Sequence, residues 1–304
     1  MRRPAPSCTQ SSRSFSPGIA MAARTIASRR WVTVAIATAW LAVAPAASGI
    51  PVQPGLPEPA AEVLRRAQGG RWWSNAARLN PEILPTSDGR SFVVVWRPAG
   101  SAPTRWIVSL HGSRGFATDD LAIWSPSLEG RDLGIVCLQW WIGTDDSTSS
   151  YLTPVQIDRE IGRVLQRLGV KPGRAMLHGF SRGAANIYAV AALDAGGGRR
   201  SFALVVASSG GVAEDYPPTR ALLAGSYGDH PLRGTRWVTA AGARDPHPDR
   251  DGIPAMRRTA EWLVAQGAVV VERIEDPSQG HGALQLDRAN ARHLVDLFLK
   301  ESVE

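Results

Sequence analysis

The chain has 304 residues and a formal net charge of +7, from 34 basic and 27 acidic side chains. Six arginines fall within residues 1–46, which contain no acid, so the remaining chain of about 258 residues is almost neutral. The basic excess belongs to the N-terminus and gives no support for a nucleic-acid or anionic-membrane partner. The remaining length is enough for one well-buried domain and short for two.

Residues 1–46 have the order of a secretory signal peptide. The basic pair Arg29-Arg30 precedes an uncharged, mostly apolar run over residues 31–44, and an Ala-Pro-Ala site ends at Ala46. A basic n-region, an apolar h-region and small residues at the cleavage site are typical of such signals. The apolar run is shorter than the ~20 residues of a bilayer-spanning helix, so no stable membrane span is predicted. We expect a secreted or periplasmic protein.

Two properties of this leader stay open. Met21 is an alternative start, because residues 1–20 resemble neither a leader nor a folded segment. Ser28-Arg29-Arg30 resembles a twin-arginine export signal, so the route is either Sec or twin-arginine. Removal of residues 1–46 leaves Cys137 as the single cysteine. The exported chain therefore cannot form an internal disulfide, and Cys137 is expected in the core.

The first elements after the leader fall into two groups. Residues 47–80 are predicted to be a linker rich in Pro, Gly and Ala, followed by an amphipathic helix over 60–68. From residue 81 the pattern changes to two strand-like runs, 82–84 and 91–97, with a turn signature at 86–89 between them. This pair is expected to be antiparallel.

Further along, short apolar runs alternate with helical stretches. The predicted strands are 106–110, 134–140, 175–178, 202–207, 236–241 and 269–274, and the predicted helices are 118–130, 153–168, 182–193, 253–266 and 283–301. Near-continuous apolar strands separated by helices indicate a parallel sheet that is covered on both faces. We predict one α/β domain over 81–304, with a mostly parallel central sheet of about eight strands.

The segment Gly179-Phe180-Ser181-Arg182-Gly183 lies between the predicted strand 175–178 and a helix rich in small residues. In such a turn the serine takes strained backbone angles, and side chains in place of the two glycines would collide with the neighbouring strand and helix. The serine oxygen then stands at a helix N-terminus, where peptide N–H groups point outward. The pentapeptide alone is weak evidence, but its position predicts that Ser181 is a nucleophile.

With this turn the chain resembles the α/β-hydrolase superfamily over residues 81–301. His111-Gly112-Ser113-Arg114-Gly115 follows a strand, like the family's oxyanion loop, and Ser181 follows the fifth strand. Ala241-Gly242-Ala243-Arg244-Asp245 is similar to the acid loop, and Gly280-His281-Gly282 follows the last strand and opens the last predicted helix. The order Ser, Asp, His is the one this fold uses. The general form is similar to lidless esterases and dienelactone-hydrolase-like proteins.

The resemblance implies a catalytic triad. Ser181 would attack a carbonyl carbon and form an acyl-enzyme, and His281 would act as its general base. Asp245 would orient the imidazole, because it leaves its strand in a Gly-x-x-Asp sequence. Asp249 is the alternative acid, since Ile253-Pro254 follows it at a spacing that family members often show.

The resemblance also implies how the substrate is bound. The backbone N–H groups of Ser113 and Arg182 would form the oxyanion hole. Trp141 and Tyr151, near the loop after the fourth strand, are candidate substrate-binding residues, with packing aromatics as the alternative. The segment 211–234, where this superfamily inserts its cap, is short, so the lid is small or absent. No cofactor is expected, and no spacing of His, Cys, Asp or Glu matches a metal site.

The sequence thus predicts a secreted serine hydrolase that cleaves carboxylic esters, with a small-molecule or polymeric ester as substrate. One alternative is a serine peptidase or amidase similar to the prolyl-oligopeptidase catalytic domain. The other is a catalytically silent binding protein on the same scaffold. The sequence does not name the natural substrate, because the fold identifies a scaffold and specificity depends on the shape of the pocket.

Overall fold

The computed structural model describes residues 55–301. The predicted signal peptide, the alternative start at Met21 and most of the predicted linker lie outside these residues, so those interpretations stay predictions. Among the described residues, every helix is too short or too polar to span a membrane.

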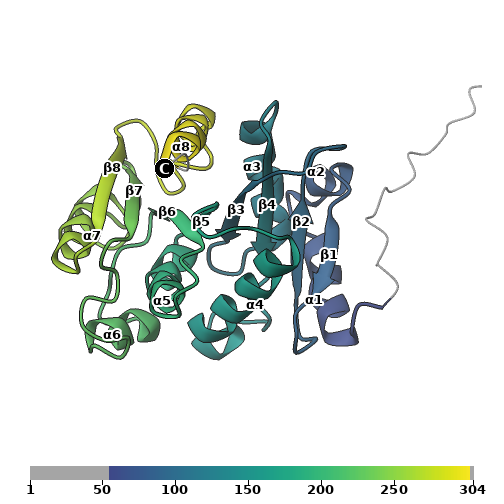
Figure 1. Ribbon diagram of the computed structural model, residues 1–304, viewed down its shortest axis with the longest axis horizontal. Helices are drawn as coiled ribbons and strands as arrows, with labels where there is room; N and C mark the ends of the chain where they lie inside the picture. The colour runs from purple at the N-terminus through teal and green to yellow at the C-terminus, as the bar shows by residue number, and fades with distance from the viewer. Residues whose placement is uncertain (1–54, 302–304) are drawn as a thin grey trace, which may run out of the picture. The chain divides into compact units, whose positions relative to one another are not determined.

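One eight-stranded sheet forms the centre of the domain (Figure 1), in the order β1-β2-β4-β3-β5-β6-β7-β8. Its strands are β1 (Glu82–Pro85), β2 (Phe92–Trp96), β3 (Arg105–Leu110), β4 (Leu133–Leu138), β5 (Ala175–Phe180), β6 (Phe202–Ser208), β7 (Arg236–Gly242) and β8 (Val269–Asp276). Strand β2 pairs antiparallel with both β1 and β4, whereas the strands β3 to β8 run parallel to one another. The predicted mostly parallel sheet, with an antiparallel first pair, is confirmed.

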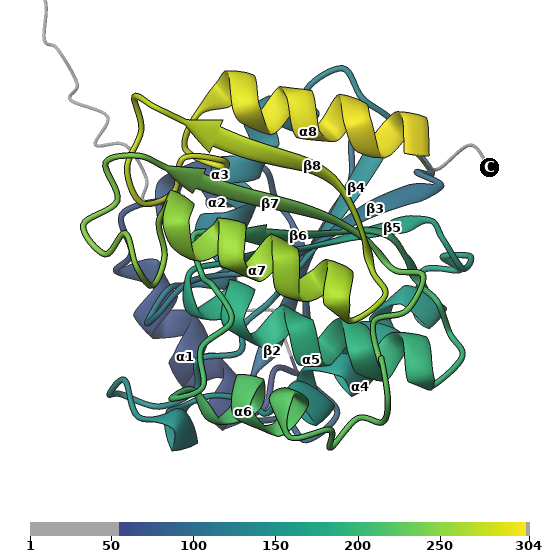
Figure 2. The same cartoon turned by 90° about the vertical axis from the view of Figure 1, so that its left-hand side faces the viewer.

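Helices cover both faces of this sheet (Figure 2). They are α1 (Glu58–Gln68), α2 (Trp73–Arg78), α3 (Ala117–Leu128), α4 (Pro154–Arg167), α5 (Arg182–Gly196), α6 (Pro217–Leu223), α7 (Ile253–Ala265) and α8 (Arg288–Glu301), with a short 3-10 turn at Thr148–Ser150. Helices α3 and α8 lie over one face, and α4, α5 and α7 lie over the other. Parallel strands buried on both faces explain why their sequences are apolar almost throughout.

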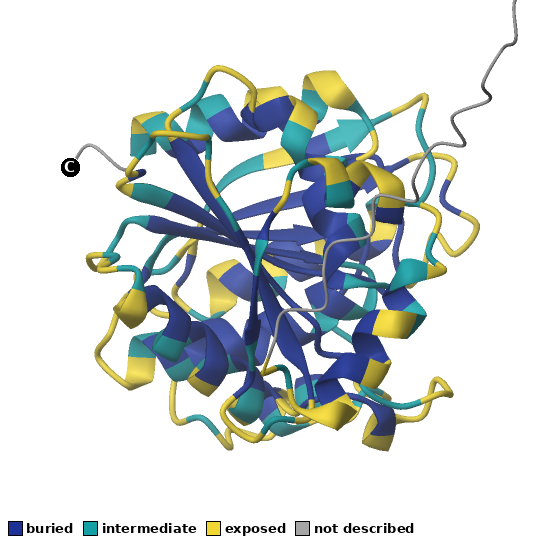
Figure 3. Cartoon of the chain, turned by 90° about the vertical axis from the view of Figure 1, so that its right-hand side faces the viewer, coloured by how far each residue is buried: buried dark blue, intermediate teal, exposed yellow. Residues whose placement is uncertain are grey.

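Two apolar clusters fill the space between the sheet and its helices, and the strands β2 to β7 are the most deeply buried elements (Figure 3). The cluster beneath α3 and α8 also takes in Val63 and Leu64 of α1 and Trp73 of α2. The described part of the predicted linker region therefore packs into the same core as the strands. Cys137 is buried in β4, as predicted.

The last helix differs from the prediction. It was expected from residue 283 but begins at Arg288, and residues 281–285 form turns with Gly282 at φ 92°. The side chain of Asp287 accepts hydrogen bonds from the backbone N–H groups of Ala289 (2.9 Å) and Asn290 (3.0 Å). An aspartate in this role is a helix N-cap, so the helix starts after it. His281 consequently lies on a loop before the helix and not at its first turn.

Candidate active site

The turn after β5 places Ser181 in a strained conformation at the start of α5. Its backbone has φ 54° and ψ −119°, and its N–H donates a 2.8 Å hydrogen bond to the Ser208 carbonyl at the end of β6. A non-glycine residue in this region costs about 1–3 kcal/mol and persists only where the surroundings hold it. The side chain lines a cavity at the carboxyl edge of the sheet. This is the expected form of the predicted nucleophile turn.

Two glycines make that turn possible because no side chain fits at either position. A Cβ atom on Gly179 would lie 2.5 Å from the Gly183 carbonyl oxygen. A Cβ atom on Gly183 would lie 2.2 Å from the Leu110 carbonyl oxygen at the end of β3. The first turn of α5 therefore rests directly on β3, which brings the nucleophile next to the loop that follows this strand.

We expect Gly183→Ala to lower the free energy of unfolding by about 3 kcal/mol, the upper part of the range for overpacking, because the obstacle is backbone and cannot rotate away. Gly196 is the matched control at the other end of the same helix, since a Cβ atom there meets nothing within 4 Å. Gly196→Ala should raise the free energy of unfolding by about 0.5–1 kcal/mol. Denaturant titration of both variants measures the difference, and equal stabilities would contradict the close packing of α5 on β3.

Asp245 and His281 meet at the same edge of the sheet. The Nδ1 atom of His281 lies 2.8 Å from Oδ2 of Asp245, whose side chain is fully buried. The other carboxylate oxygen accepts a 2.9 Å hydrogen bond from the backbone N–H of His247. With Nδ1–H donating to the carboxylate, Nε2 carries the lone pair that a general base needs. The His281 ring lies 4.8 Å from the ring of Phe180, which directly precedes Ser181.

The structure separates the two candidate acids. Asp249 is exposed, and its only recorded hydrogen bond within residues 55–301 is accepted by its backbone carbonyl from Arg258. Asp251, which we did not predict as a site residue, is buried beside the pair instead. Ligand atoms of Asp245, Asp251 and His281 all lie within 4.8 Å of one another. Their geometry favours Asp245 as the partner of the imidazole.

Asp245, Asp251 and His281 are also the group of described side chains that could hold a metal ion. All three already have protein partners. His281 uses Nδ1 for Asp245, and Asp251 accepts from Nε (3.0 Å) and Nη2 (2.8 Å) of Arg250. The arrangement is therefore that of an oriented histidine with an ion pair beside it.

The predicted oxyanion loop lies against the nucleophile turn. A Cβ atom on Gly112 would lie 3.0 Å from the Phe180 ring and 3.4 Å from Cβ of Ser181. Ser113 and Ser181 line the same cavity, and Nε of Arg182 donates a 3.2 Å hydrogen bond to Oγ of Ser113. The N–H of Arg182 opens α5 and so has no acceptor within the helix. These positions suit an oxyanion hole, which stays a prediction for Ser113 and Arg182.

The cavity beside Ser181 has a volume of about 280 Å³. Its walls come from the loops after β3, β4, β6 and β7, the edge at which ligands bind in open α/β sheets. The lining residues are Ser113, Asp146, Ser181, Arg182, Ala185, Gly210, Gly211, Ala213, Asp215, Tyr216, Arg250 and Asp251. Of these, we predicted only Ser113, Ser181 and Arg182. Apart from Ala185 in α5, the others lie in loops after strands, where position is the only sequence signal.

Trp141 and Tyr151 lie outside this lining, and both are buried. The Trp141 indole donates to the Asp145 carbonyl at 2.8 Å. The Tyr151 hydroxyl donates to Asp146 at 2.5 Å and accepts from the backbone N–H of Arg114 at 2.9 Å. Burial and the Asp146 carboxylate raise the pKa of Tyr151 to about 12. Both aromatics pack behind the cavity wall, and their substrate-binding role stays a prediction.

Arg182 covers Tyr151 from the cavity side. Its guanidinium lies 4.5 Å from the Tyr151 ring and 5.6 Å from the Tyr216 ring, and Nη2 is 3.2 Å from Oδ2 of Asp146. Arg182 thus contacts side chains from the loops after β3, β4 and β6. Its side chain restricts how the cavity can deform.

His111 lies in the oxyanion loop but does not have the properties of a general base. It is buried, and its Nδ1 lies 2.8 Å from the Gly112 carbonyl, to which an N–H can donate. Burial lowers the pKa of His111 to about 4, so its ring is neutral near neutral pH. His111 therefore fits a structural role, and His281 is the histidine available for proton transfer.

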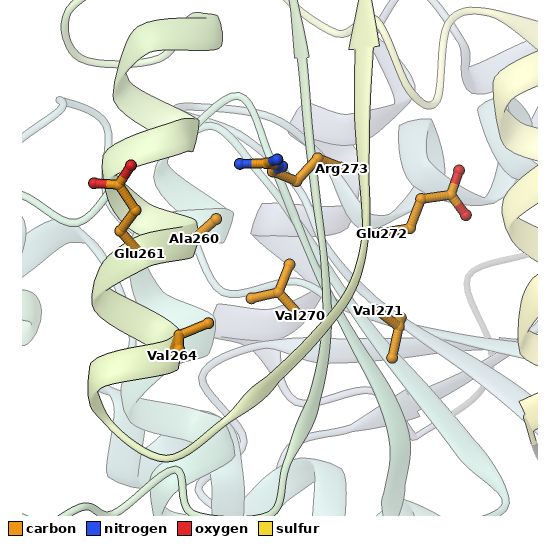
Figure 4. A pocket seen from close by; sticks show the side chains of 7 residues that line it. All are labelled: Ala260, Glu261, Val264, Val270, Val271, Glu272 and Arg273. Atoms are coloured by element: carbon orange, nitrogen blue, oxygen red, sulfur yellow. The ribbon is translucent and has the colours of Figure 1, made fainter.

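A second hollow, of about 610 Å³, lies between α7 and the edge strand β8 (Figure 4). Its labelled side chains are Ala260, Glu261, Val264, Val270, Val271, Glu272 and Arg273. None of these lining residues is a serine, a cysteine or a histidine. The smaller cavity beside Ser181 is therefore the candidate active site of the described residues.

The comparisons with known proteins give matches among solved structures only. No protein-family profile and no curated protein sequence matches the chain. Among solved structures it is similar to TT1662 from Thermus thermophilus, with 20% identity, 74% of this chain and 98% of that chain covered, and a TM-score of 0.55. A hyperthermophilic esterase from the archaeon Pyrobaculum calidifontis is 14% identical, with 73% of this chain and 82% of that chain covered and a TM-score of 0.55. A brefeldin A esterase, described as a bacterial homologue of human hormone-sensitive lipase, is 19% identical. The match covers 73% of this chain and 76% of that chain, with a TM-score of 0.50.

At these identities the likenesses show the fold alone. The chain has the fold of the α/β-hydrolase superfamily.

Proposed function

We propose that the protein is a serine hydrolase that cleaves carboxylic esters through an acyl-enzyme on Ser181. The observation that carries this proposal is the hydrogen bond between His281 and the buried carboxylate of Asp245, beside a serine held in a strained turn. Several neighbours with the same fold are named esterases, which favours esters over amides as substrates.

In the proposed reaction, Nε2 of His281 takes the proton of the Ser181 hydroxyl as its oxygen attacks the ester carbonyl carbon. The tetrahedral oxyanion accepts hydrogen bonds from the N–H groups of Ser113 and Arg182, each of which contributes roughly 3 kcal/mol to transition-state stabilisation. The imidazolium then gives its proton to the departing alcohol, and the acyl group stays on Ser181. His281 next deprotonates a water molecule that releases the acid. Asp245 keeps the imidazole in the correct tautomer throughout.

A fluorophosphonate probe tests the nucleophile directly. The folded protein should be labelled with one probe, and Ser181→Ala should not be labelled. Ser226→Ala is the control, because Ser226 is exposed and lies outside the cavity lining. A folded protein that the probe fails to label would refute the enzyme and favour the silent binding protein.

Ester and amide cleavage are separated by two chromogenic substrates. We expect p-nitrophenyl acetate to be hydrolysed and alanine p-nitroanilide to be left intact. Cleavage of the anilide alone would support the peptidase alternative instead.

We further propose that the protein is exported, on the evidence of the basic, apolar and small-residue order in residues 1–46. The mature N-terminus should then lie near Ala47. Sequencing of the N-terminus in the extracytoplasmic fraction tests this, and an intact Met1 or Met21 there would contradict it.

A further inference from the structure

We propose, resting on the proposed ester hydrolysis, that the substrate is a short-acyl ester of a hydroxyl-rich alcohol, and that Asp215 binds a hydroxyl group of that alcohol. The proposal comes from the chemistry of the cavity beside Ser181. Asp215 lies in the segment between β6 and α6 and lines this cavity.

The cavity wall offers little to an apolar substrate. Its apolar lining residues are small, namely Ala185, Gly210, Gly211 and Ala213, and Tyr216 is the one aromatic that residues 55–301 contribute. No leucine, isoleucine, valine, phenylalanine, methionine or tryptophan belongs to the lining formed by the described residues. A lengthening acyl chain gains roughly fourfold in binding per methylene group only where apolar surface surrounds it. In the cavity beside Ser181, a longer acyl chain should therefore not increase the binding affinity of the ester.

Charged groups reach the cavity from two sides. Arg182 pairs with Asp146 at 3.2 Å on the side of the loop after β4, and Arg250 pairs with Asp251 at 2.8 Å on the side of the loop after β7. A hydrocarbon placed against these groups would remove their water without replacing its hydrogen bonds, which is unfavourable. A polar ligand replaces those bonds.

Asp215 differs from the other acids of the lining. Asp146 and Asp251 are both in ion pairs, whereas Asp215 is exposed, makes no hydrogen bond or ion pair with residues 55–301, and feels only the more distant charge of Arg250. Its neighbour Tyr216 has its hydroxyl 2.6 Å from Nδ2 of Asn186, which positions the phenol at the cavity. The cavity therefore presents an unused acceptor beside an oriented aromatic ring.

The mixture of donors and acceptors decides among polar ligands. The two ion pairs cancel, and Asp215 adds a negative charge, so an anionic substrate is repelled. An ammonium group could meet Asp215, but it cannot accept hydrogen bonds from Arg182, Ser113 or Tyr216. A hydroxyl group both donates and accepts. Several hydroxyls on one alcohol, as in a sugar, match this wall best.

Three acetate esters with the same acyl group test the alcohol. We expect kcat/KM for a monoacetylated methyl glucoside to exceed that for cyclohexyl acetate and for acetylcholine by about tenfold or more. Across p-nitrophenyl acetate, butyrate and octanoate, kcat/KM should stay level or fall. A preference for cyclohexyl acetate, acetylcholine or the octanoate would overturn the proposal.

Asp215→Ala tests the residue, and Glu214→Ala is its matched control, because Glu214 is an exposed acid that lies outside the lining. Asp215→Ala should lower the preference for the glucoside ester over cyclohexyl acetate about tenfold, mainly through KM, since a charged hydrogen bond is lost. Glu214→Ala should leave the preference unchanged. Equal preferences in the two variants would refute the role of Asp215.

Fluorophosphonate labelling distinguishes failure of the proposed substrate class from failure of the proposed serine hydrolase. A protein that takes the label but does not prefer the sugar ester refutes only the substrate class. A folded protein that takes no label and hydrolyses none of the esters refutes the proposed hydrolase itself.

Discussion

Replacing Asp245 by asparagine should lower kcat for p-nitrophenyl acetate on the order of 10⁴-fold, with little change in KM. The carboxylate accepts the Nδ1–H of His281 from a fully buried position. An asparagine amide can donate to Nδ1 instead, which moves the ring proton to Nε2 and leaves no lone pair for the Ser181 hydroxyl. The geometry survives such a change, so the loss falls on the chemical step.

Two further aspartates of the same loop are the controls for Asp245→Asn. Asp249→Asn should keep kcat within about twofold, because the side chain is exposed and the imidazole Nδ1 has Asp245 as its partner. Asp251→Asn should have an intermediate effect, of about tenfold, because its carboxylate is bound by Arg250 and only lies near the ring. If Asp249→Asn proved as damaging as we expect for Asp245→Asn, the acid would be the other candidate from the sequence. Steady-state kinetics of the three variants decide the matter.

The fold and the order of the site residues could be predicted because both depend on local signals. Strands buried on both faces are apolar throughout, and Gly179 and Gly183 mark a turn that no side chain fits. The acid could not be chosen with certainty. Asp245, Asp249 and Asp251 lie within seven residues of one loop, and only the folded loop buries the first and third while it exposes the second.

Other parts of the site depend on how deep a side chain lies, which a sequence pattern does not carry. Trp141 and Tyr151 were placed near the correct loop, but Arg182 stacks over Tyr151 and takes its place at the cavity. Helices α2 and α6 were not predicted because six and seven residues give too few turns for a periodic signal. Asp215 and Tyr216, which precede α6, were missed with it.

Asp120→Asn should stabilise the folded protein by up to about 4 kcal/mol at pH 8 and leave its stability almost unchanged at pH 4. Asp120 lies in the first turn of α3 and is buried, and Ser109 of β3 donates a 2.7 Å hydrogen bond to its carboxylate. Burial, with a smaller contribution from the charge of Asp119, raises the pKa of Asp120 to about 7. Its usual pKa is about 3.8, and each unit of difference corresponds to about 1.4 kcal/mol.

The pH dependence of the free energy of unfolding follows from how many protons the folded and unfolded chains bind. Between pH 4 and 7 the folded chain keeps a proton on Asp120 that the unfolded chain has released, so the free energy of unfolding contributed by this group falls as the pH rises through that range. Above pH 7 the folded protein carries a buried carboxylate, and the free energy of unfolding contributed by Asp120 falls no further. Asparagine has no proton to release and can still accept from Ser109, so the variant lacks this loss.

Buried histidines change the free energy of unfolding with pH in the opposite direction, and so mask the effect of Asp120 in the unmodified protein. Burial lowers the pKa of His178, 2.9 Å from Ser109, to about 3, so its contribution to stability is lost as the pH falls below about 6.5. The test is therefore the difference between Asp120→Asn and the unmodified protein in urea titrations at pH 4, 6 and 8, in which the histidine contribution cancels. Asp249→Asn, on the exposed loop, serves as the control for the removal of one carboxylate. A difference for Asp120→Asn that stays constant from pH 4 to 8 would mean that the buried carboxyl group of Asp120 is ionised in the folded protein throughout.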